Sequence, residues 1–312
     1  MMKINSRSIF TAAAVAATTF AMSSALSSPA WATLGQATDW QLGLQEPASP
    51  TKLKMEHFHN DMLLPLIVAI SIFVMLLLIY VMLRFNTKTN PTPSKTTHNT
   101  LLEVIWTGVP VLILVLLVIP SMKLLYFADK SHNPEMTLKV TGYQWYWGYE
   151  YPDHGGINFS ANMKKDEELA QGEPRLLATD NAIVLPVDTD IQILTTASDV
   201  IHSWAVPAFG IKIDAVPGRT NETWVRIDKE GTFYGQCSEI CGNGHGFMPI
   251  QVKAVSKEAF AEWVKAQGGK MPAPKAAAAV EGAAVAATPA SEKPAEEASE
   301  DKAEEQTEEK SE

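Results

Sequence analysis

Two long apolar segments dominate the pattern of hydrophobic and polar positions along the chain. Residues 62–83, MLLPLIVAISIFVMLLLIYVML, and residues 104–122, VIWTGVPVLILVLLVIPSM, contain no charged side chain. Each has about the 20 residues that an α-helix needs to cross the hydrocarbon core of a bilayer. A core helix of a soluble protein rarely lacks a polar face over such a length. The pattern therefore predicts a transmembrane helical hairpin over residues 62–126.

The short loop between these segments indicates the orientation of the hairpin. It carries three basic residues and no acid, and short loops of this kind stay on the cytoplasmic side. Residues 1–32 predict the same orientation. They have a basic start, an apolar run and a small-residue stretch ending at Ala32, which is the pattern of an exported signal peptide. The alternative, a short transmembrane helix, is disfavoured by the length and the Ala/Thr content of the run. We expect residues 33–61 and the chain beyond residue 126 on the outer side.

Beyond the second span, the pattern changes to short runs rich in β-branched and aromatic residues, many of them separated by turn sequences. Helical patterns do not alternate with these runs, so they predict an all-β sandwich or Greek-key barrel. The predicted strands are residues 137–151, 182–187, 190–196, 201–206, 222–227, 231–237 and 247–255.

One amphipathic helix is predicted to close this domain, which spans residues 127–270. Ser256 can cap its N-terminus, and Phe260, Trp263 and Val264 form one apolar face. The last segment, residues 271–312, consists mainly of Ala, Glu, Lys, Pro and Ser. Such a composition cannot bury enough apolar area to offset its ordering entropy, so we predict a disordered tail.

The charge of the chain excludes one class of partner. The formal net charge is −10, which argues against nucleic acid, whose phosphates require a basic surface. The tail has eleven acids against four bases, and residues 129–270 have nineteen acids against thirteen bases. The folded part is therefore acidic without its tail, and a basic partner fits it.

The only two cysteines of the chain lie together with other soft donors. Cys237 and Cys241 precede His245 and Met248 in the stretch GQCSEICGNGHGFMPIQ. Export permits a disulfide, but residues four apart form a cramped one; taken alone, the Cys-x-x-x-Cys spacing leaves disulfide and metal open. The neighbours favour metal, because the loop resembles the copper-ligand loop of blue-copper proteins, in which sulfur and imidazole hold the ion between two strands.

A second imidazole and a second thiol extend this hypothesis. His202, in VIHSWAVP, can supply the other imidazole. A structural zinc site is less suitable, because zinc in such sites takes four ligands in a closed tetrahedron and no methionine. Two thiolates in one loop can each bridge two metal ions, with His202 on one ion and His245 on the other. Met248 and the backbone carbonyl of Glu239 can serve as weaker donors. No acid–base pair accompanies the cluster, which suits an electron relay rather than a catalyst.

Four motifs together resemble subunit II of cytochrome c oxidase, of the bacterial kind that is similar to the mitochondrial enzyme. They are LLEVIWTGVPVLIL, GYQWYWGYEY, IHSWAVPAFGIKIDAVPGR and CSEICGNGHGFMP, in the order of the family, and the resemblance covers roughly residues 50–270. It implies a transmembrane hairpin followed by a cupredoxin-like Greek-key barrel with a dinuclear copper centre, Cu(A). Such a subunit accepts electrons from cytochrome c and passes them to the haem of subunit I, where oxygen is reduced to water with proton translocation.

The resemblance also implies site residues. The copper ligands would be His202, Cys237, Cys241, His245, Met248 and the backbone carbonyl of Glu239. The side chain of Glu239 would bind magnesium shared with subunit I, and Trp145 would receive the electron from cytochrome c. Glu150, Asp180 and Asp199 match acids of the surface on which cytochrome c docks.

Further expectations concern the assembled enzyme. Glu103 matches an acid near the mouth of a proton channel of subunit I. Without the resemblance, the sequence around Glu103 fits an interfacial carboxylate beside Trp106 equally well. Subunits I and III and membrane lipid would be partners, in a bacterial inner membrane with the N-terminus and copper domain in the periplasm. One departure from the family is the stretch 154–174, which reads as an inserted loop.

Three rival functions differ in features that this sequence can test. A quinol oxidase subunit II would share the anchor but lack Cys237 and Cys241. The copper domain of nitrous-oxide reductase has the same ligand set, but it lacks a two-helix anchor and belongs to a far larger chain. A membrane-tethered copper carrier would need neither Trp145 nor the acidic surface.

Overall fold

The structure is a computed structural model that describes residues 34–272 except residues 39, 42 and 130–132. The predicted signal peptide lies outside the described residues, and so does the predicted tail apart from residues 271 and 272.

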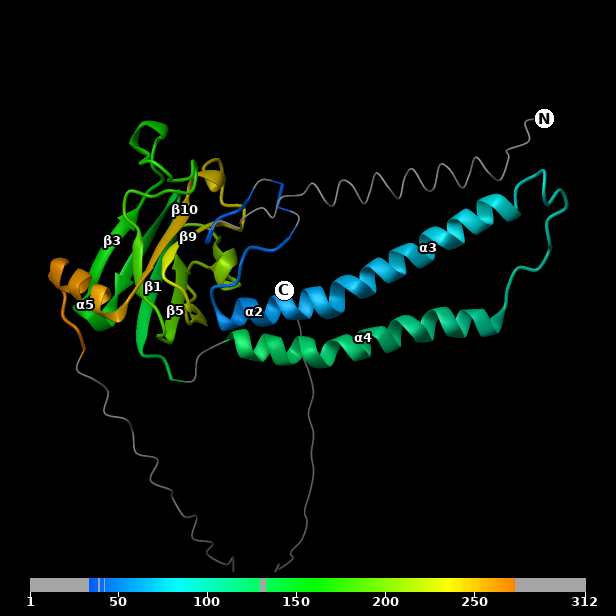
Figure 1. Ribbon diagram of the computed structural model, residues 1–312, viewed down its shortest axis with the longest axis horizontal. Coiled ribbons are helices and arrows are strands. Elements are labelled where there is room, and N and C mark those ends of the chain that lie inside the picture. Colours follow the sequence, from blue (N-terminus) through cyan, green and yellow to red (C-terminus); the bar gives the residue numbers. More distant parts are fainter. Residues whose placement is uncertain (1–33, 39, 42, 130–132, 273–312) are drawn as a thin grey trace, which may run out of the picture. The chain divides into compact units, whose positions relative to one another are not determined.

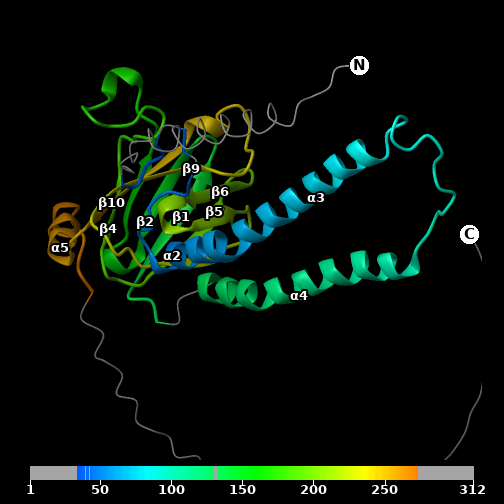
Figure 2. The same ribbon diagram turned by 45° about the vertical axis from the view of Figure 1, so that its right-hand side comes forward.

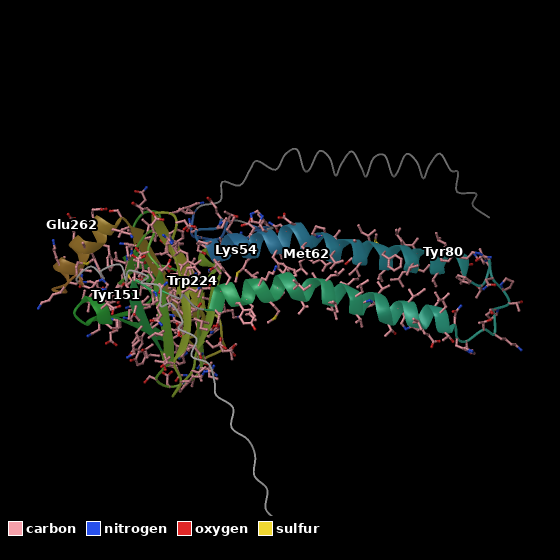
Figure 3. The ribbon with its side chains drawn as sticks, turned by 90° about the horizontal axis from the view of Figure 1, so that it is seen from below. Lys54, Met62, Tyr80, Tyr151, Trp224 and Glu262 are labelled. Carbon is pink, nitrogen blue, oxygen red and sulfur yellow. The ribbon has the colours of Figure 1, made fainter. Side chains whose placement is uncertain are left out.

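Two long helical segments contain the predicted spans. The first runs without a break from α2 (Pro50–His57) through a π-helical turn η1 (Phe58–Leu63) to α3 (Leu64–Arg84), and the second is α4 (Thr100–Asp129). Both are long and apolar enough to cross a membrane, and the apolar window of each has no buried residue, unlike a soluble core helix. Figure 3 shows side chains projecting along both helices, with Met62 and Tyr80 near the two ends of the first apolar segment.

The β domain consists of two five-stranded sheets (Figures 1 and 2). The first sheet has the order β3-β2-β1-β5-β8 and the second the order β4-β10-β9-β6-β7. Both mix parallel and antiparallel pairs, since β1 pairs parallel with β5 and β10 pairs parallel with β4. The strands are β1 (Met136–Tyr143), β2 (Tyr146–Tyr151), β3 (Ile157–Ala161), β4 (Ile183–Pro186), β5 (Ile191–Ala197), β6 (His202–Val206), β7 (Ile211–Ala215), β8 (Asn221–Val225), β9 (Gly231–Cys237) and β10 (Pro249–Val255).

Three predictions about the strands need correction. The run 137–151 is not one strand, because Gln144 and Trp145 form the turn of a hairpin between β1 and β2. Its sequence has no glycine or proline at the turn, so the apolar pattern continues through it. The stretch 154–174 is not only a loop, because it contains β3, which pairs with β2 along its whole length. The strand β7 was also missed, although IKIDA alternates with the two-residue period of a strand.

The core lies between the two sheets. Trp147 from the first sheet and Trp204 from the second are fully buried, and so are Phe209 and Phe233. The Tyr151 hydroxyl joins the sheets, since it donates to the carbonyl oxygen of Val184 at 3.0 Å and accepts from the same residue's backbone N–H at 3.1 Å. The all-β class predicted from the sequence is confirmed.

The predicted closing helix is α5 (Lys257–Ala266). The Ser256 hydroxyl accepts a hydrogen bond from the backbone N–H of Ala259 at 3.2 Å, as an N-cap does. Phe260 and Val264 are buried against the sheets, and Trp263 packs beside them.

Candidate metal centre

The candidate metal centre forms where β9, β10 and β6 meet. Cys237 is the last residue of β9, and β10 begins one residue after Met248. His202 opens β6, a neighbour of β9 in the same sheet, where Trp204 pairs with Cys237. The connection between β9 and β10 turns sharply at Gly242, whose φ of 118° is a left-handed conformation that favours glycine. The sheet thus brings His202 to a loop far from it in sequence.

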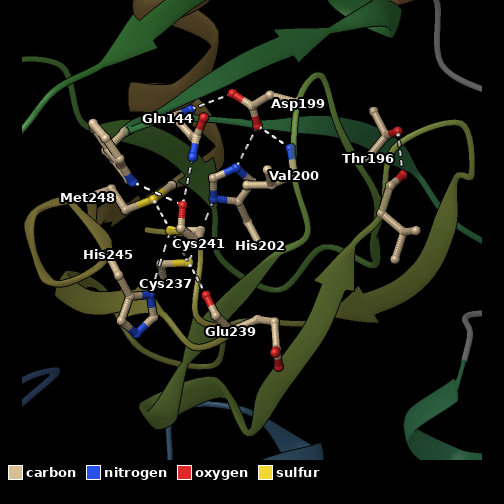
Figure 4. A network of polar contacts seen from close by, with 12 residues as sticks. Gln144, Thr196, Asp199, Val200, His202, Cys237, Glu239, Cys241, His245 and Met248 are labelled. Carbon is tan, nitrogen blue, oxygen red and sulfur yellow. Dashed lines mark hydrogen bonds and ion pairs between the residues drawn. The ribbon is translucent and has the colours of Figure 1, made fainter. Parts of the chain in front are cut away.

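Cys237 has three potential ligand atoms around its sulfur (Figure 4). Its Sγ lies 3.9 Å from His202 Nδ1, 3.3 Å from the carbonyl oxygen of Glu239 and 3.9 Å from Cys241 Sγ. His202, Cys237 and Cys241 are all buried, with their ligand atoms within 4.8 Å of one another. The first half of the predicted ligand set therefore converges.

Cys241 carries the second half. Its Sγ lies 3.7 Å from His245 Nδ1 and 3.6 Å from Met248 Sδ. Each sulfur thus has its own imidazole, and the two sulfurs face each other. Met248 is buried, and its backbone carbonyl accepts a hydrogen bond from the Trp147 indole at 3.1 Å, which fixes the start of β10 beside the site.

Both cysteines are free thiols in the structure. Their sulfurs are 3.9 Å apart, whereas a disulfide requires about 2.05 Å. Burial opposes ionisation of Cys237, but hydrogen bonds with His202 and with nearby backbone groups outweigh it and lower its pKa to about 6. Burial, together with the nearby Cys237 charge, raises the pKa of Cys241 to about 12. One thiolate is therefore available near neutral pH, and binding of a metal ion would release the second proton.

The donor set fits copper. Soft sulfur and imidazole donors select copper, zinc or iron–sulfur clusters over the hard cations that prefer oxygen. Structural zinc takes four ligands in a closed tetrahedron, whereas here a thioether and a carbonyl oxygen add two weaker donors to the four strong ones. Two sulfurs that each face a separate imidazole suit a pair of ions better than one.

The ring of His202 is held in one orientation. Its Nδ1 faces Cys237, and its Nε2 lies 2.9 Å from Asp199 Oδ1. Gly142 makes room for the ring, since a Cβ atom there would lie 2.7 Å from the His202 Cδ2 atom. Burial lowers the pKa of His202, but Cys237 and Asp199 outweigh burial and raise it overall.

Trp145, in the turn between β1 and β2, packs against the connection between β9 and β10, which carries Cys241, His245 and Met248 and is called the ligand loop below. Its indole Nε1 donates to the carbonyl oxygen of Cys241 at 3.2 Å, and 37% of the residue remains exposed. The ring packs closely on Gly244, where an added Cβ would lie 2.3 Å from the Trp145 Cγ and Cδ2 atoms. The residue predicted to receive electrons therefore contacts both the ligand loop and solvent.

The other predicted residues have more varied surroundings. Glu239 is exposed, and its carboxylate points away from the sulfur atoms in Figure 4. Glu150 pairs with Lys139 at 3.2 Å. Asp180 accepts from the backbone N–H of Asn162 at 2.8 Å. Glu103 lies in the first turn of α4.

The sequence reasoning missed two residues at the site. Gln144 donates through its side-chain Nε2 to the carbonyl oxygen of Cys241 at 2.8 Å, and through its backbone N–H to Asp199 Oδ2 at 2.7 Å. Gly244 gives Trp145 its place on the loop. Gln144 stands inside a motif that carries the family resemblance, but only the three-dimensional contacts give it a role.

The fold and the site together define a class. Two membrane-capable helices precede an all-β, cupredoxin-like domain that gathers two thiols, two imidazoles and a thioether, so the class is a membrane protein with a buried donor cluster able to hold a metal ion. Known proteins make the class more specific. The profile of the family described as "Cytochrome C oxidase subunit II, periplasmic domain" matches residues 136–255, and that of the corresponding transmembrane domain matches residues 37–124.

Individual relatives agree with the family match. A probable cytochrome c oxidase subunit 2 of Rickettsia bellii (strain RML369-C) is 53% identical over 225 residues, which are 72% of this chain and 83% of that protein. Cytochrome c oxidase subunit 2 of Phytophthora megasperma is 47% identical over 237 residues, covering 74% of this chain and 89% of that protein. The crystal structure of the periplasmic domain of subunit II of cytochrome oxidase (CoxB) of Bradyrhizobium japonicum is 50% identical, with a TM-score of 0.41, and covers 44% of this chain and 95% of that chain. The chain belongs to the cytochrome c oxidase subunit II family, as the four motifs predict.

Proposed function

We propose that this chain is the subunit of a haem–copper oxidase that accepts electrons from cytochrome c at a dinuclear Cu(A) centre. It passes them to the haem of subunit I, where oxygen is reduced to water and protons are translocated. The observation that carries the proposal is the pair of buried sulfurs 3.9 Å apart, each facing its own imidazole. The residues that would hold the two ions are His202, Cys237, Cys241, His245, Met248 and the backbone carbonyl of Glu239.

Copper bound here supplies a one-electron redox couple, and the residues of the chain set its surroundings. Cys237, Cys241 and Met248 are less than a tenth exposed, so water is largely excluded from the sulfur donors. Outer-shell contacts orient ligands, and the contacts of Asp199 with His202 and of Trp147 with the Met248 carbonyl would limit movement of these donors during electron transfer. Trp145 offers the route inward, because its indole is partly exposed on one side and hydrogen-bonded to a ligand residue on the other.

An acidic surface would bring the donor to Trp145. Such a surface would attract a lysine-rich cytochrome c, and opposite charges mainly raise the association rate and lose effect as salt increases. Glu150, Asp180 and Asp199 are the acids assigned to this surface. Of these, Asp199 is the one whose carboxylate also bonds a ligand of the metal centre.

Other roles concern the contact with subunit I. The exposed carboxylate of Glu239 would bind a magnesium ion shared with that subunit, while its carbonyl oxygen faces the copper site. Glu103 would lie near the mouth of a proton channel of subunit I. Subunit III completes the set of partners, and the helices would anchor the chain in a bacterial inner membrane with its β domain in the periplasm.

Copper stoichiometry in the full chain tests the proposal. The chain would be purified in detergent, reduced, loaded with copper and examined by metal analysis and electron paramagnetic resonance. We expect two copper ions per chain and the hyperfine pattern of one electron shared equally by two copper nuclei. Cys237→Ser, which keeps the shape of the side chain, should reduce the pattern to that of a single nucleus. One copper ion per wild-type chain, or none, would contradict a dinuclear site.

A further inference from the structure

Asp199 has too many partners for a residue that serves only as a surface charge. Its Oδ2 accepts from the Gln144 backbone N–H at 2.7 Å, and its Oδ1 accepts from the Val200 backbone N–H at 2.7 Å. The same Oδ1 lies 2.9 Å from His202 Nε2. These contacts are drawn in Figure 4, and the side chain is only 32% exposed. The carboxylate therefore connects the β1–β2 turn to a predicted copper ligand.

Gln144 makes the second connection. Its backbone N–H is held by Asp199, while its side-chain Nε2 donates to the carbonyl oxygen of Cys241 at 2.8 Å. The indole of the next residue, Trp145, donates to the same oxygen at 3.2 Å. A carbonyl oxygen has two lone pairs, and these two donors satisfy both. The turn that carries Trp145 is thus tied to His202 through Asp199 and to Cys241 directly.

The contact between Asp199 and His202 also determines which ring nitrogen is free for a metal. A histidine ligand commonly donates its other N–H to a carboxylate, which fixes the tautomer and the orientation of the ring. Here the carboxylate faces Nε2, so Nδ1 is the nitrogen directed at Cys237 Sγ.

We propose that Gln144 and Asp199 are positioning residues that together form a clamp, holding the electron-accepting Trp145 against the ligand loop and fixing the His202 ring. This inference rests on the proposed function for the meaning of Trp145 and His202, but its geometry does not require bound metal. Loss of the clamp should therefore change the surroundings of Trp145 in the metal-free chain as well as the rate of electron transfer in the loaded one.

The test compares two substitutions that remove the same charge. In Asp199→Asn, the amide nitrogen cannot accept from either the Gln144 N–H or the His202 N–H, so at least one contact of the clamp is lost. Glu150→Gln also removes one negative charge, but the Glu150 carboxylate accepts from Lys139, outside the clamp. Gln144→Ala removes the side-chain contact with Cys241 and leaves the net charge unchanged.

Two readouts on the full chain in detergent separate positioning from docking. The first is the indole ¹⁵N–¹H signal of Trp145 in the metal-free, ¹⁵N-tryptophan-labelled chain, assigned with Trp145→Phe. We expect it to shift in Asp199→Asn and in Gln144→Ala and to stay in place in Glu150→Gln. The second is the rate of electron transfer from reduced cytochrome c to the copper-loaded chain as a function of salt.

For Asp199→Asn, we expect a rate about 10-fold below wild type that remains low at high salt, because loss of an outer-shell partner typically costs 10–100-fold. The smaller loss in Glu150→Gln should disappear as salt screens the charges. If Asp199→Asn recovers with salt and leaves the Trp145 signal in place, Asp199 only docks the donor and the clamp is refuted. Failure of the wild-type chain to bind copper would overturn the proposed function instead, and the indole signal would still decide whether the clamp exists.

Discussion

The β domain buries two histidines whose surroundings differ in almost every respect. His202 is fully buried, with Cys237 on one ring nitrogen and Asp199 on the other. His154 is 2% exposed and packs against the rings of Tyr151 and Phe260. Its Nδ1 has no hydrogen-bond partner among the residues that the structure describes. Burial alone therefore does not distinguish a metal ligand from a core residue.

The difference appears in the acidity of the two rings. Burial is the largest single influence on both His202 and His154, and it lowers the pKa of each ring. At His202, Cys237 and Asp199 reverse this and raise the pKa, whereas at His154 the charge of Asp153 opposes burial only in part and the pKa stays lowered. A buried imidazole with a carboxylate on one ring nitrogen and a thiol on the other has surroundings that favour a bound proton or metal ion. A buried imidazole among aromatic rings remains neutral.

The largest expected effect comes from exchanging each histidine for a glutamine. His202→Gln removes a ligand, so copper affinity should fall by more than about 100-fold, because even outer-shell partners contribute 10–100-fold. His154→Gln keeps a neutral, polar side chain of similar size and should leave the affinity within a few-fold. Competition with a copper chelator, monitored on the full chain in detergent, measures both. Equal losses in the two variants would mean that the first acts through stability rather than ligation.

A smaller effect is expected from moving Trp145 without touching a ligand. Gly244→Ala places a Cβ where Trp145 lies, 2.3 Å from two of its ring atoms, and the φ of −91° at Gly244 adds no strain. Displacement of about 1 Å can cost up to about 100-fold in rate, so we expect electron transfer from cytochrome c to slow by about 10-fold to 100-fold. Copper content should remain unchanged.

Gly246→Ala is the matched control for this substitution. Gly246 also lies beside His245, but an added Cβ there meets no atom within 4 Å. It should transfer electrons at nearly the wild-type rate. If both alanine variants slow the reaction equally, the loop as a whole, and not the contact with Trp145, controls the rate.

These contacts also show which parts of the site can be read from the sequence. The donors from Cys237 to Met248 lie within one short loop, so their chemistry is visible as a local pattern. Neither residue of the turn, Gln144 or Trp145, is a glycine or proline, so the turn gave no local signal, and the contacts of Gln144 with Asp199 and Cys241 span 55 and 97 residues. Such contacts depend on how the two sheets pack, for which no local pattern exists. The clamp was therefore outside the reach of the sequence, and Asp199 was assigned only to the docking surface.

The same reasoning applies to the fold. The apolar spans and the capped helix α5 have strong local signals, and each was predicted where a helix is found; the two membrane-capable helices, Pro50–Arg84 and Thr100–Asp129, extend beyond the predicted spans 62–83 and 104–122. The strand β3, INFSA, is short, and its central residues are not buried, so it lacked a clear apolar pattern. Its place in the sheet comes from pairing with β2, a non-local interaction.

The smallest expected effect is a loss of stability at low pH that His154, whose pKa is lowered, should cause in the metal-free chain; His202, whose pKa is raised, should act in the opposite direction. His154 has a lowered pKa when folded, whereas the unfolded chain has a histidine pKa of about 6.5. Below about pH 6.5 the unfolded state therefore binds a proton that the folded state does not. The free energy of unfolding should fall by up to about 1.4 kcal/mol per pH unit as the pH decreases from 6.5 toward the folded pKa. Above pH 6.5 this contribution is constant. Denaturant unfolding of wild type and His154→Gln between pH 5 and 8 isolates it, because every other titrating group is shared. Parallel curves for the two proteins would show that His154 takes up its proton without unfolding, and the contrast with His202 would then lie in ligation alone.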